Sequence, residues 1–176
     1  MPRKPVSSAP PRPGGIVSSS HLVSTRSVEL SEFEFGLIVA WNAFSRWAVR
    51  CMAAAGCPDL TITDVLLMHH ISHRARNKKL ADICFVLNYE DTHVVAYSLK
   101  KLVAAGLVAA HKQGKEVFYS PSGEGEAFVR QYREVRAECL VKSLDTELNA
   151  DIGELARLLR TMSGMYDQAA RAATSL

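Results

Sequence analysis

The sequence has 176 residues, 48% of them hydrophobic, and a formal net charge of +3. This length suits one domain with a hydrophobic core plus an appendage, and it is too short for two large domains. No apolar run approaches the roughly 20 residues that span a bilayer, which excludes an integral membrane protein. The four cysteines lie far apart and no signal-peptide pattern opens the chain, so we expect a reduced, cytoplasmic protein.

Positive charge is concentrated in two stretches of the chain. Residues 1–28 carry four basic residues and no acidic one, and residues 74–115 carry eight basic residues and three acidic ones, so the rest of the chain is acidic. A local basic face on an acidic body suits docking to a polyanion. The first stretch also holds five of the seven prolines, which predicts a flexible tail ahead of one domain over residues 29–176.

The first helix is predicted over about residues 31–56. Ser31 is a good N-cap, and Glu34, three residues further on, completes a capping box. Apolar residues recur at spacings of four and three from Leu37 onward, which indicates a long helix with one apolar stripe, and Gly56 ends the pattern.

Three more helical elements are predicted before the chain changes its periodicity. A second helix begins after Thr61 or Thr63, and a third, short helix covers residues 78–87. The tetrapeptide NYED then supplies Asn88 as a cap with Asp91 at the third helical position, and this opens a fourth helix.

A β-hairpin follows the fourth helix. Gly106 is a suitable left-handed C-cap, and residues 107–111 and 116–120 read as two short strands joined by the basic turn KQGK. The order of helix, short helix, tight turn, helix and hairpin predicts a winged helix-turn-helix over about residues 60–121. The predicted fold is mostly α with a small β-hairpin wing.

Two further helices are predicted over about residues 123–172, and the second carries an apolar stripe typical of a coiled-coil seam. A winged-helix core of about sixty residues does not need these helices, or the first one, to bury its core. A second copy of the chain would cover them, so we predict a homodimer. The residues expected in the dimer interface are Leu37, Trp41, Leu148, Ile152, Leu155, Leu159 and Met162.

The segment KKLADICFVLNYEDTHVVAYSLKKLVAAGLV and the following wing HKQGKEVFYSPSGEGEAF resemble the MarR family of bacterial transcription regulators. The resemblance covers roughly residues 31–170 and implies dimers with a central winged helix-turn-helix between dimerisation helices. The sequence departs from the family in the wing, where KQGKEV replaces the usual Asp-x-Arg pair. We therefore expect Lys112 and Lys115 to contact DNA in place of an arginine braced by an aspartate.

The fourth helix is the predicted recognition helix, since one of its faces is polar and the opposite face carries Val95, Leu99 and Leu102. His93 and Tyr97 could contact base edges or sugars, and Lys100 could reach a guanine or a phosphate. An ordinary solvated helix face is the alternative. The full set of predicted DNA-binding residues is Lys78, Lys79, Thr92, His93, Ala96, Tyr97, Lys100, Lys101, Lys112 and Lys115.

Three other features allow a functional and a structural interpretation. His69 and His73 would share one helix face, but spacing alone is weak support for a metal site, and we predict neither a metal nor a cofactor. Cys51 falls on the apolar stripe of the first helix, where a buried thiol is usually inert and redox sensing is the alternative. The aromatic residues Trp41, Phe44 and Trp47 are either core or the lining of a ligand pocket.

The sequence contains no phosphate-binding loop, no nucleophile elbow and no close carboxylate pair, so we do not expect an enzyme. We predict a sequence-specific regulator that binds double-stranded DNA as a homodimer on a near-palindromic operator, in the bacterial cytoplasm and on the nucleoid when bound. A small-molecule effector is a further candidate partner, and its identity does not follow from the resemblance. The alternative function is a winged-helix protein-interaction or scaffold module.

Overall fold

The computed structural model describes residues 27–73 and 77–176, so nearly all of the predicted basic tail lies outside the described residues. In chain order the elements are α1 (Val28–Ala54), α2 (Ile62–Ser72), β1 (Lys78–Lys79), α3 (Leu80–Leu87), α4 (Thr92–Ala104), β2 (Val108–Gln113), β3 (Glu116–Pro121), α5 (Gly123–Cys139), the short 3-10 helix η3 (Val141–Ser143) and α6 (Thr146–Ala173).

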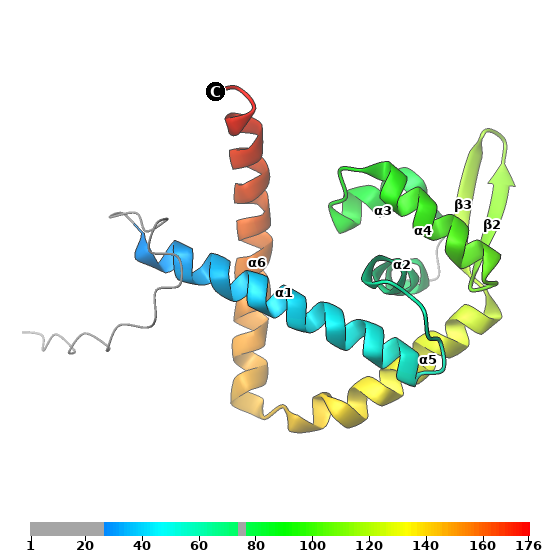
Figure 1. Cartoon of the computed structure of the whole chain (residues 1–176), viewed down its shortest axis with the longest axis horizontal. Helices are drawn as coiled ribbons and strands as arrows, with labels where there is room; N and C mark the ends of the chain where they lie inside the picture. The colour runs from blue at the N-terminus through cyan, green and yellow to red at the C-terminus, as the bar shows by residue number, and fades with distance from the viewer. Residues whose placement is uncertain (1–26, 74–76) are drawn as a thin grey trace, which may run out of the picture.

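The chain forms one lobe and two long helices that extend away from it (Figure 1). The lobe contains α2, α3, α4 and the β2–β3 hairpin, whereas α5 leads from the lobe to the lower end of α6. The sheet is antiparallel and has the strand order β1-β3-β2. The predicted fold class, mostly helical with a small β wing, is confirmed.

The core lies around α2, which packs against α1, α4 and α5. Leu67 and Ile71 of α2, Ile83 of α3 and Leu99 of α4 are fully buried, and burial of such side chains stabilises the fold by about 1.5 to 3 kcal/mol each. The helix begins as predicted after Thr61, whose hydroxyl accepts a hydrogen bond from the backbone N–H of Asp64.

The predicted start of the first helix was wrong by one turn. α1 begins at Val28, and Ser27 is its N-cap, since the Ser27 hydroxyl accepts a hydrogen bond from the N–H of Leu30. Ser31 is buried inside the helix. Glu34 accepts a hydrogen bond from the Tyr166 hydroxyl of α6 at 3.0 Å, and so it serves a contact between distant helices rather than a capping box.

The turn between α3 and α4 also differs from the prediction. Asn88 is the C-cap of α3, with a left-handed backbone at φ +56°, which asparagine tolerates better than most residues. Asp91 is the N-cap of α4 and accepts a hydrogen bond from the N–H of His93 at 2.8 Å. The local sequence offered two cap residues, and the structure uses them at the ends of two different helices.

The wing is longer than predicted and has a third strand. β2 and β3 pair from Val108 opposite Pro121 to Gln113 opposite Glu116, and the turn contains Gly114 at φ +63°. The two residues of β1 pair with β3, Lys79 opposite Phe118. A strand this short has no periodicity of its own, so the sequence assigned these residues to the start of a helix.

Close contact between α5 and the start of the hairpin makes Gly125 sensitive to substitution. A Cβ atom at Gly125 would clash with the carbonyl oxygen of Leu107, a backbone atom that cannot turn aside. We expect Gly125→Ala to destabilise the protein by about 1 to 3 kcal/mol, as overpacking usually does. Thermal unfolding would measure this loss. Gly123→Ala is the control, because a Cβ there meets no atom within 4 Å; equal stability of both variants would contradict the prediction.

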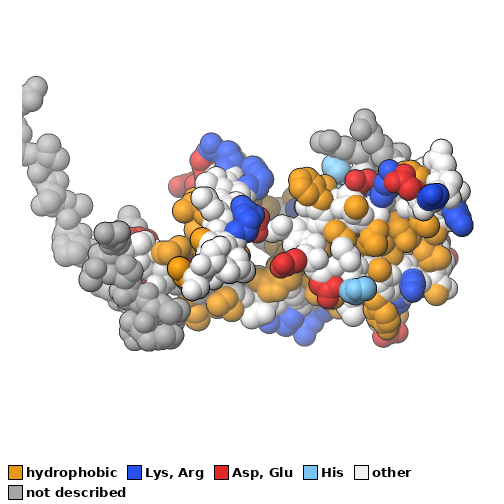
Figure 2. Space-filling view, turned by 90° about the horizontal axis from the view of Figure 1, so that it is seen from above, with side chains coloured by type: hydrophobic (Ala, Val, Ile, Leu, Met, Phe, Trp, Pro, Cys, Tyr) orange, Lys and Arg blue, Asp and Glu red, His pale blue; other side chains and the backbone are white. Residues whose placement is uncertain are grey.

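α6 is a long helix that the described residues leave largely uncovered. None of its 28 residues is buried, and no other element of the described chain packs extensively against it. α1 likewise exposes large apolar side chains, and seen from above such side chains lie along α1 and beside α6, left of centre (Figure 2). No described helix combines the length and the apolar character needed to cross a membrane.

Candidate DNA-binding surface

The face of α4 that the sequence assigned to DNA is exposed in the structure. Val95, Leu99 and Leu102 are fully buried on the opposite side, and these three anchor the helix to the core. Tyr97 is 75% exposed, and it shares the outer face with three exposed residues and with Ala96, which is half-buried. The exposed residues beside Tyr97 on this face and at the start of the helix are Thr92, His93, Lys100 and Ala104.

Three of the predicted lysines keep their charge free at the surface. Lys100 lies on the outer face of α4, Lys112 near the end of β2 and Lys115 in the turn of the wing, and all three are exposed. In the described part of the chain none of them forms an ion pair. Lysine or arginine side chains are visible at the right-hand edge of the molecule, over the wing (Figure 2). An ammonium group without a partner in the chain can neutralise a phosphate.

Lys101 is directed into the protein. Its ammonium donates to the carboxylate of Asp64 at 2.7 Å and to the backbone carbonyl of Asp59 at 2.8 Å. Asp64 is 1% exposed and also accepts from the Ser98 hydroxyl and from the N–H of Thr61. Burial raises the pKa of Asp64, but the hydrogen bonds from Lys101, Ser98 and Thr61 outweigh it, so the pKa lies below its ordinary value. This network joins α4 to the N-terminus of α2.

Lys78 and Lys79 of β1 also have partners within the chain. The Lys78 ammonium donates to the carbonyls of Ile71 at 3.0 Å and His73 at 2.7 Å, at the C-terminal end of α2, and burial lowers the pKa of Lys78. The Lys79 ammonium pairs with Glu116 at 2.5 Å. For Lys78, Lys79 and Lys101, contact with DNA stays a prediction, and the structure gives each of them an internal role.

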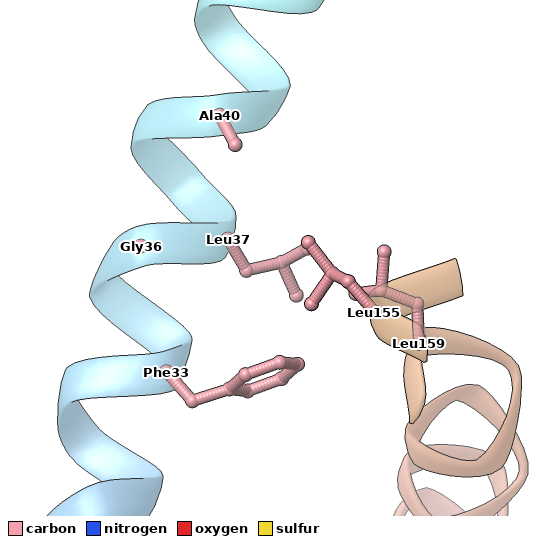
Figure 3. Close-up of a pocket in the computed structure, with 6 residues that line it drawn as sticks. All are labelled: Phe33, Gly36, Leu37, Ala40, Leu155 and Leu159. Atoms are coloured by element: carbon pink, nitrogen blue, oxygen red, sulfur yellow. The ribbon is translucent and has the colours of Figure 1, made fainter. Parts of the chain in front are cut away.

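The predicted interface residues lie on the surfaces that α1 and α6 turn toward each other or to solvent. Leu37 and Leu155 are exposed and point toward one another across an apolar cleft of about 300 Å³ (Figure 3). The cleft is lined by Phe33, Gly36, Leu37, Ala40, Leu155 and Leu159. Trp41, Leu148 and Ile152 are exposed, whereas Leu159 and Met162 are half-buried. α1 and α6 cross without packing extensively against each other, so residues 27–73 and 77–176 leave most of both apolar stripes uncovered.

The alternative sites receive structural explanations. The His69 ring packs edge-on against Tyr132 at 4.3 Å between ring centres, and burial together with Arg133 and Arg136 lowers its pKa. His73, at the C-cap of α2, is exposed. Across residues 27–73 and 77–176 no group of three or more His, Cys, Asp or Glu side chains could hold a metal ion.

The buried thiol of Cys51 donates to the carbonyl of Tyr132 at 3.6 Å, and burial raises the pKa of this thiol, which makes it a poor nucleophile. The aromatic residues of α1 separate into two groups. Trp47 packs against the core, whereas Trp41 and Phe44 are about half exposed and stack at a tilt with ring centres 6.1 Å apart. They extend the uncovered face of α1.

The sequence analysis did not identify two carboxylates that form ion pairs with predicted DNA-binding lysines, Asp64 with Lys101 and Glu116 with Lys79. Asp64 was assigned to the second helix and Glu116 to a strand, and in both cases the lysine lies far away in the sequence. For Asp64 a local signal was present, since an acid at the third position of a helix often completes a capping box. For Glu116 no local signal existed, because its partner Lys79 belongs to the two-residue strand β1.

Comparisons with known proteins agree with this geometry. Residues 60–125 match the winged helix DNA-binding domain family. Among similar solved structures, AbfR of Staphylococcus epidermidis has a TM-score of 0.63 and 18% identity, and the match covers 77% of this chain and 92% of that chain. A MarR transcriptional regulator from Methanosarcina mazei Go1 has a TM-score of 0.63 and 12% identity, with 85% of this chain and 97% of that chain covered. Sco5413, a MarR family transcriptional regulator from Streptomyces coelicolor, has a TM-score of 0.61 and 17% identity, with 78% of this chain and 97% of that chain covered. No curated protein matches at a significant level. The chain therefore has a winged-helix domain within the fold of MarR regulators, and the resemblance read from the sequence is confirmed.

Proposed function

We propose that this protein is a sequence-specific transcription regulator of MarR type that binds double-stranded DNA as a homodimer on a near-palindromic operator. The observation that carries the proposal is the outer face of α4, where exposed His93, Tyr97 and Lys100 stand on a helix anchored by three fully buried residues. The exposed lysines of the wing and the winged-helix match support it. We also propose a non-enzymatic role in the bacterial cytoplasm, with a small-molecule effector as a further candidate partner.

Homodimerisation is supported by the apolar surface that the described part of one chain leaves open. α6 carries Leu148, Ile152 and Leu155, all exposed, on a helix without a buried residue. A surface helix with a wide apolar stripe is stable only when another surface covers that stripe. In a two-fold dimer the same patch of each copy covers that of the other, and two recognition helices then face the same side of a duplex.

Selection of bound sites from random duplex DNA tests the proposal directly. Two-fold symmetry predicts a near-palindrome whose half-sites lie about one helical turn, roughly 10 bp, or a multiple of it apart. Footprinting of the recovered sequence would then measure the spacing. Recovery of a single asymmetric half-site would contradict the homodimer model, and recovery of no sequence would contradict sequence-specific binding.

A second function is supported by one observation on α3. Phe85 is 86% exposed and its neighbour Val86 is 61% exposed, which is unusual for large apolar side chains. Such a pair would suit a protein-interaction or scaffold module in which the lobe binds another protein. Salt dependence separates the two functions, because binding of generic duplex DNA weakens steeply with salt and a scaffold that ignores DNA shows no such binding.

The recognition helix and the wing are expected to make different contributions. Tyr97→Ala should weaken operator binding by about 1 to 3 kcal/mol and leave binding to unrelated duplexes nearly unchanged, because base-edge contacts carry discrimination. Lys115→Ala should weaken binding to both kinds of DNA by a similar factor and lower the salt slope by roughly one unit per lost phosphate contact. Titrations at several salt concentrations, on operator and scrambled DNA, would measure both effects. A Lys115 variant that loses operator binding alone would show that the wing reads sequence.

A further inference from the structure

Glu116 occupies an unexpected place for a carboxylate, at the base of the wing turn beside Lys115. Its carboxylate pairs with the Lys79 ammonium at 2.5 Å, and both side chains are partly exposed, at 54% and 37%. The Lys79 ammonium also lies 5.3 Å from the centre of the Phe118 ring, where a cation is attracted to the ring face. Two contacts therefore hold Lys79 over the sheet.

The register of the sheet explains why these three side chains meet. Lys79 of β1 lies opposite Phe118 of β3, and Glu116 is two residues from Phe118, so all three lie on the same face. The N–H of Lys79 also donates to the carboxylate of Asp82 in the first turn of α3. Lys79 therefore links the end of the wing to the N-terminal end of α3, the first helix of the helix-turn-helix.

Resting on the proposed DNA-binding function, we propose that Glu116 is a positioning residue for DNA binding, which holds Lys79 away from the DNA phosphates, fixes the wing relative to α3 and so limits the sequence-independent part of the affinity. Each lysine that reaches a phosphate adds affinity for any duplex, whatever its sequence. Such a contact strengthens binding to operator and to unrelated duplexes by a similar factor, so it would increase retention on the many non-operator sites without improving discrimination. Pairing with Glu116 leaves Lys112 and Lys115 as the exposed, unpaired lysines of the described wing.

Salt titrations of four proteins test this role: the full-length wild type, Glu116→Gln, Lys79→Gln and the double variant. Glu116→Gln frees Lys79, so we expect several-fold tighter binding to an unrelated duplex at about 0.1 M salt. The slope of log affinity against log salt should become steeper by roughly 0.9 for each head that gains a contact. The ratio of operator to non-specific affinity should stay nearly unchanged, because phosphate contacts carry no sequence information. The double variant lacks both charges and should keep the wild-type slope.

Controls separate this effect from net charge and from unfolding. Glu134→Gln, on the exposed side of α5, makes the same change in net charge away from the wing and should leave the salt slope unchanged. Thermal unfolding should shift little in all variants, since partly exposed ion pairs contribute little to stability. A large shift in the double variant alone would indicate damage to the wing, and Lys79→Met with Glu116→Leu then supplies an apolar pair for the same comparison.

The outcomes distinguish failure of the inference from failure of the proposed function. If the double variant loses about one slope unit per head while Glu116→Gln matches the wild type, Lys79 already contacts phosphate and the inference is wrong. If neither variant changes the salt slope, the pair has no role in DNA binding, and the inference is again wrong. If the wild-type protein binds neither operator nor unrelated duplex, the proposed function itself fails, and the inference fails with it.

Discussion

Leu155→Glu is expected to convert the proposed dimer into monomers and to reduce operator affinity by a factor of about 100 or more. Leu155 is exposed on α6 and lines the apolar cleft against Leu37 of α1 (Figure 3). In a two-fold interface the substitution places two unpaired carboxylates in an apolar surface, and each costs several kcal/mol to desolvate. A free-energy change of 1.4 kcal/mol corresponds to a factor of ten, so a desolvation cost of about 3 kcal/mol already accounts for a hundredfold loss of operator affinity.

Sedimentation equilibrium and DNA titration would measure this prediction together. Gln168→Glu is the matched control, because Gln168 is an exposed residue of the same helix on the side away from Leu155 and accepts a charge of the same sign. The control should remain dimeric and bind operator like the wild type. A Leu155→Glu protein that stays dimeric at micromolar concentration would show that this part of α6 lies outside the interface.

Lys101→Met is expected to destabilise the folded protein by about 2 to 3 kcal/mol. The substitution leaves the Asp64 carboxylate, 2% exposed, without its cation, although Ser98 and Thr61 still donate to it. Removal of one partner from a fully buried pair costs about 3 to 5 kcal/mol, and the cost is lower here because the Lys101 side chain is 36% exposed and water can replace it in part. Chemical denaturation would measure the loss.

Lys100→Met is the matched control, because Lys100 is the preceding residue and faces outward without an ion pair in the described chain. It should leave stability within about 0.5 kcal/mol of the wild type and should weaken DNA binding instead. The two neighbouring lysines are thus expected to show opposite results. Equal loss of stability in both variants, or in neither, would contradict the assignment of Lys101 to the network around Asp64.

The same network predicts how stability depends on pH. The pKa of Asp64 lies below its ordinary value of 3.8 in the folded state, so at acidic pH the unfolded chain binds the proton first. The stabilisation by Asp64 is therefore fully present above the pKa of the unfolded chain and is lost as the pH falls through the lower folded-state pKa. The difference in unfolding free energy between wild type and Lys101→Met should accordingly be large at pH 7 and shrink below about pH 4. A difference that is constant across this range would rule out Asp64 as its source.

Some features of this protein could be read from the sequence because the forces that produce them are local. The stripe of Val95, Leu99 and Leu102 predicts a helix with one buried face, and the burial of all three confirms it. Gly106 and the turn around Gly114 both adopt the positive φ angles that glycine tolerates, so the end of α4 and the hairpin were also predictable. Periodicity and turn chemistry depend on neighbours within a few residues, which a single sequence contains.

Cap residues show where local information becomes ambiguous. Ser27 and Ser31 are both suitable N-caps one turn apart, and the structure uses Ser27 because Ser31 is buried within α1. Asn88 and Asp91 are likewise both capping residues, and only the path of the chain between α3 and α4 decides which helix each one serves. The free-energy difference between alternative caps is about 1 kcal/mol, and packing of the helix against the core easily exceeds it.

Only the tertiary structure decided which lysines form ion pairs within the chain and which stay exposed. From the sequence, Lys78, Lys79, Lys100 and Lys101 form two similar basic pairs, all expected to face DNA. Lys101 turns inward because Asp64, 37 residues away, is brought beside it when α2 packs against α4. Lys79 pairs with Glu116, also 37 residues away, because β1 joins the sheet. The sequence by itself determined the helices, the wing and the excess of basic residues. Only the tertiary structure decided which of these lysines remain free to bind a partner, because folding brings carboxylates within hydrogen-bonding distance of some of them. An ion pair depends on the distance between two charges in space, however far apart they lie along the chain.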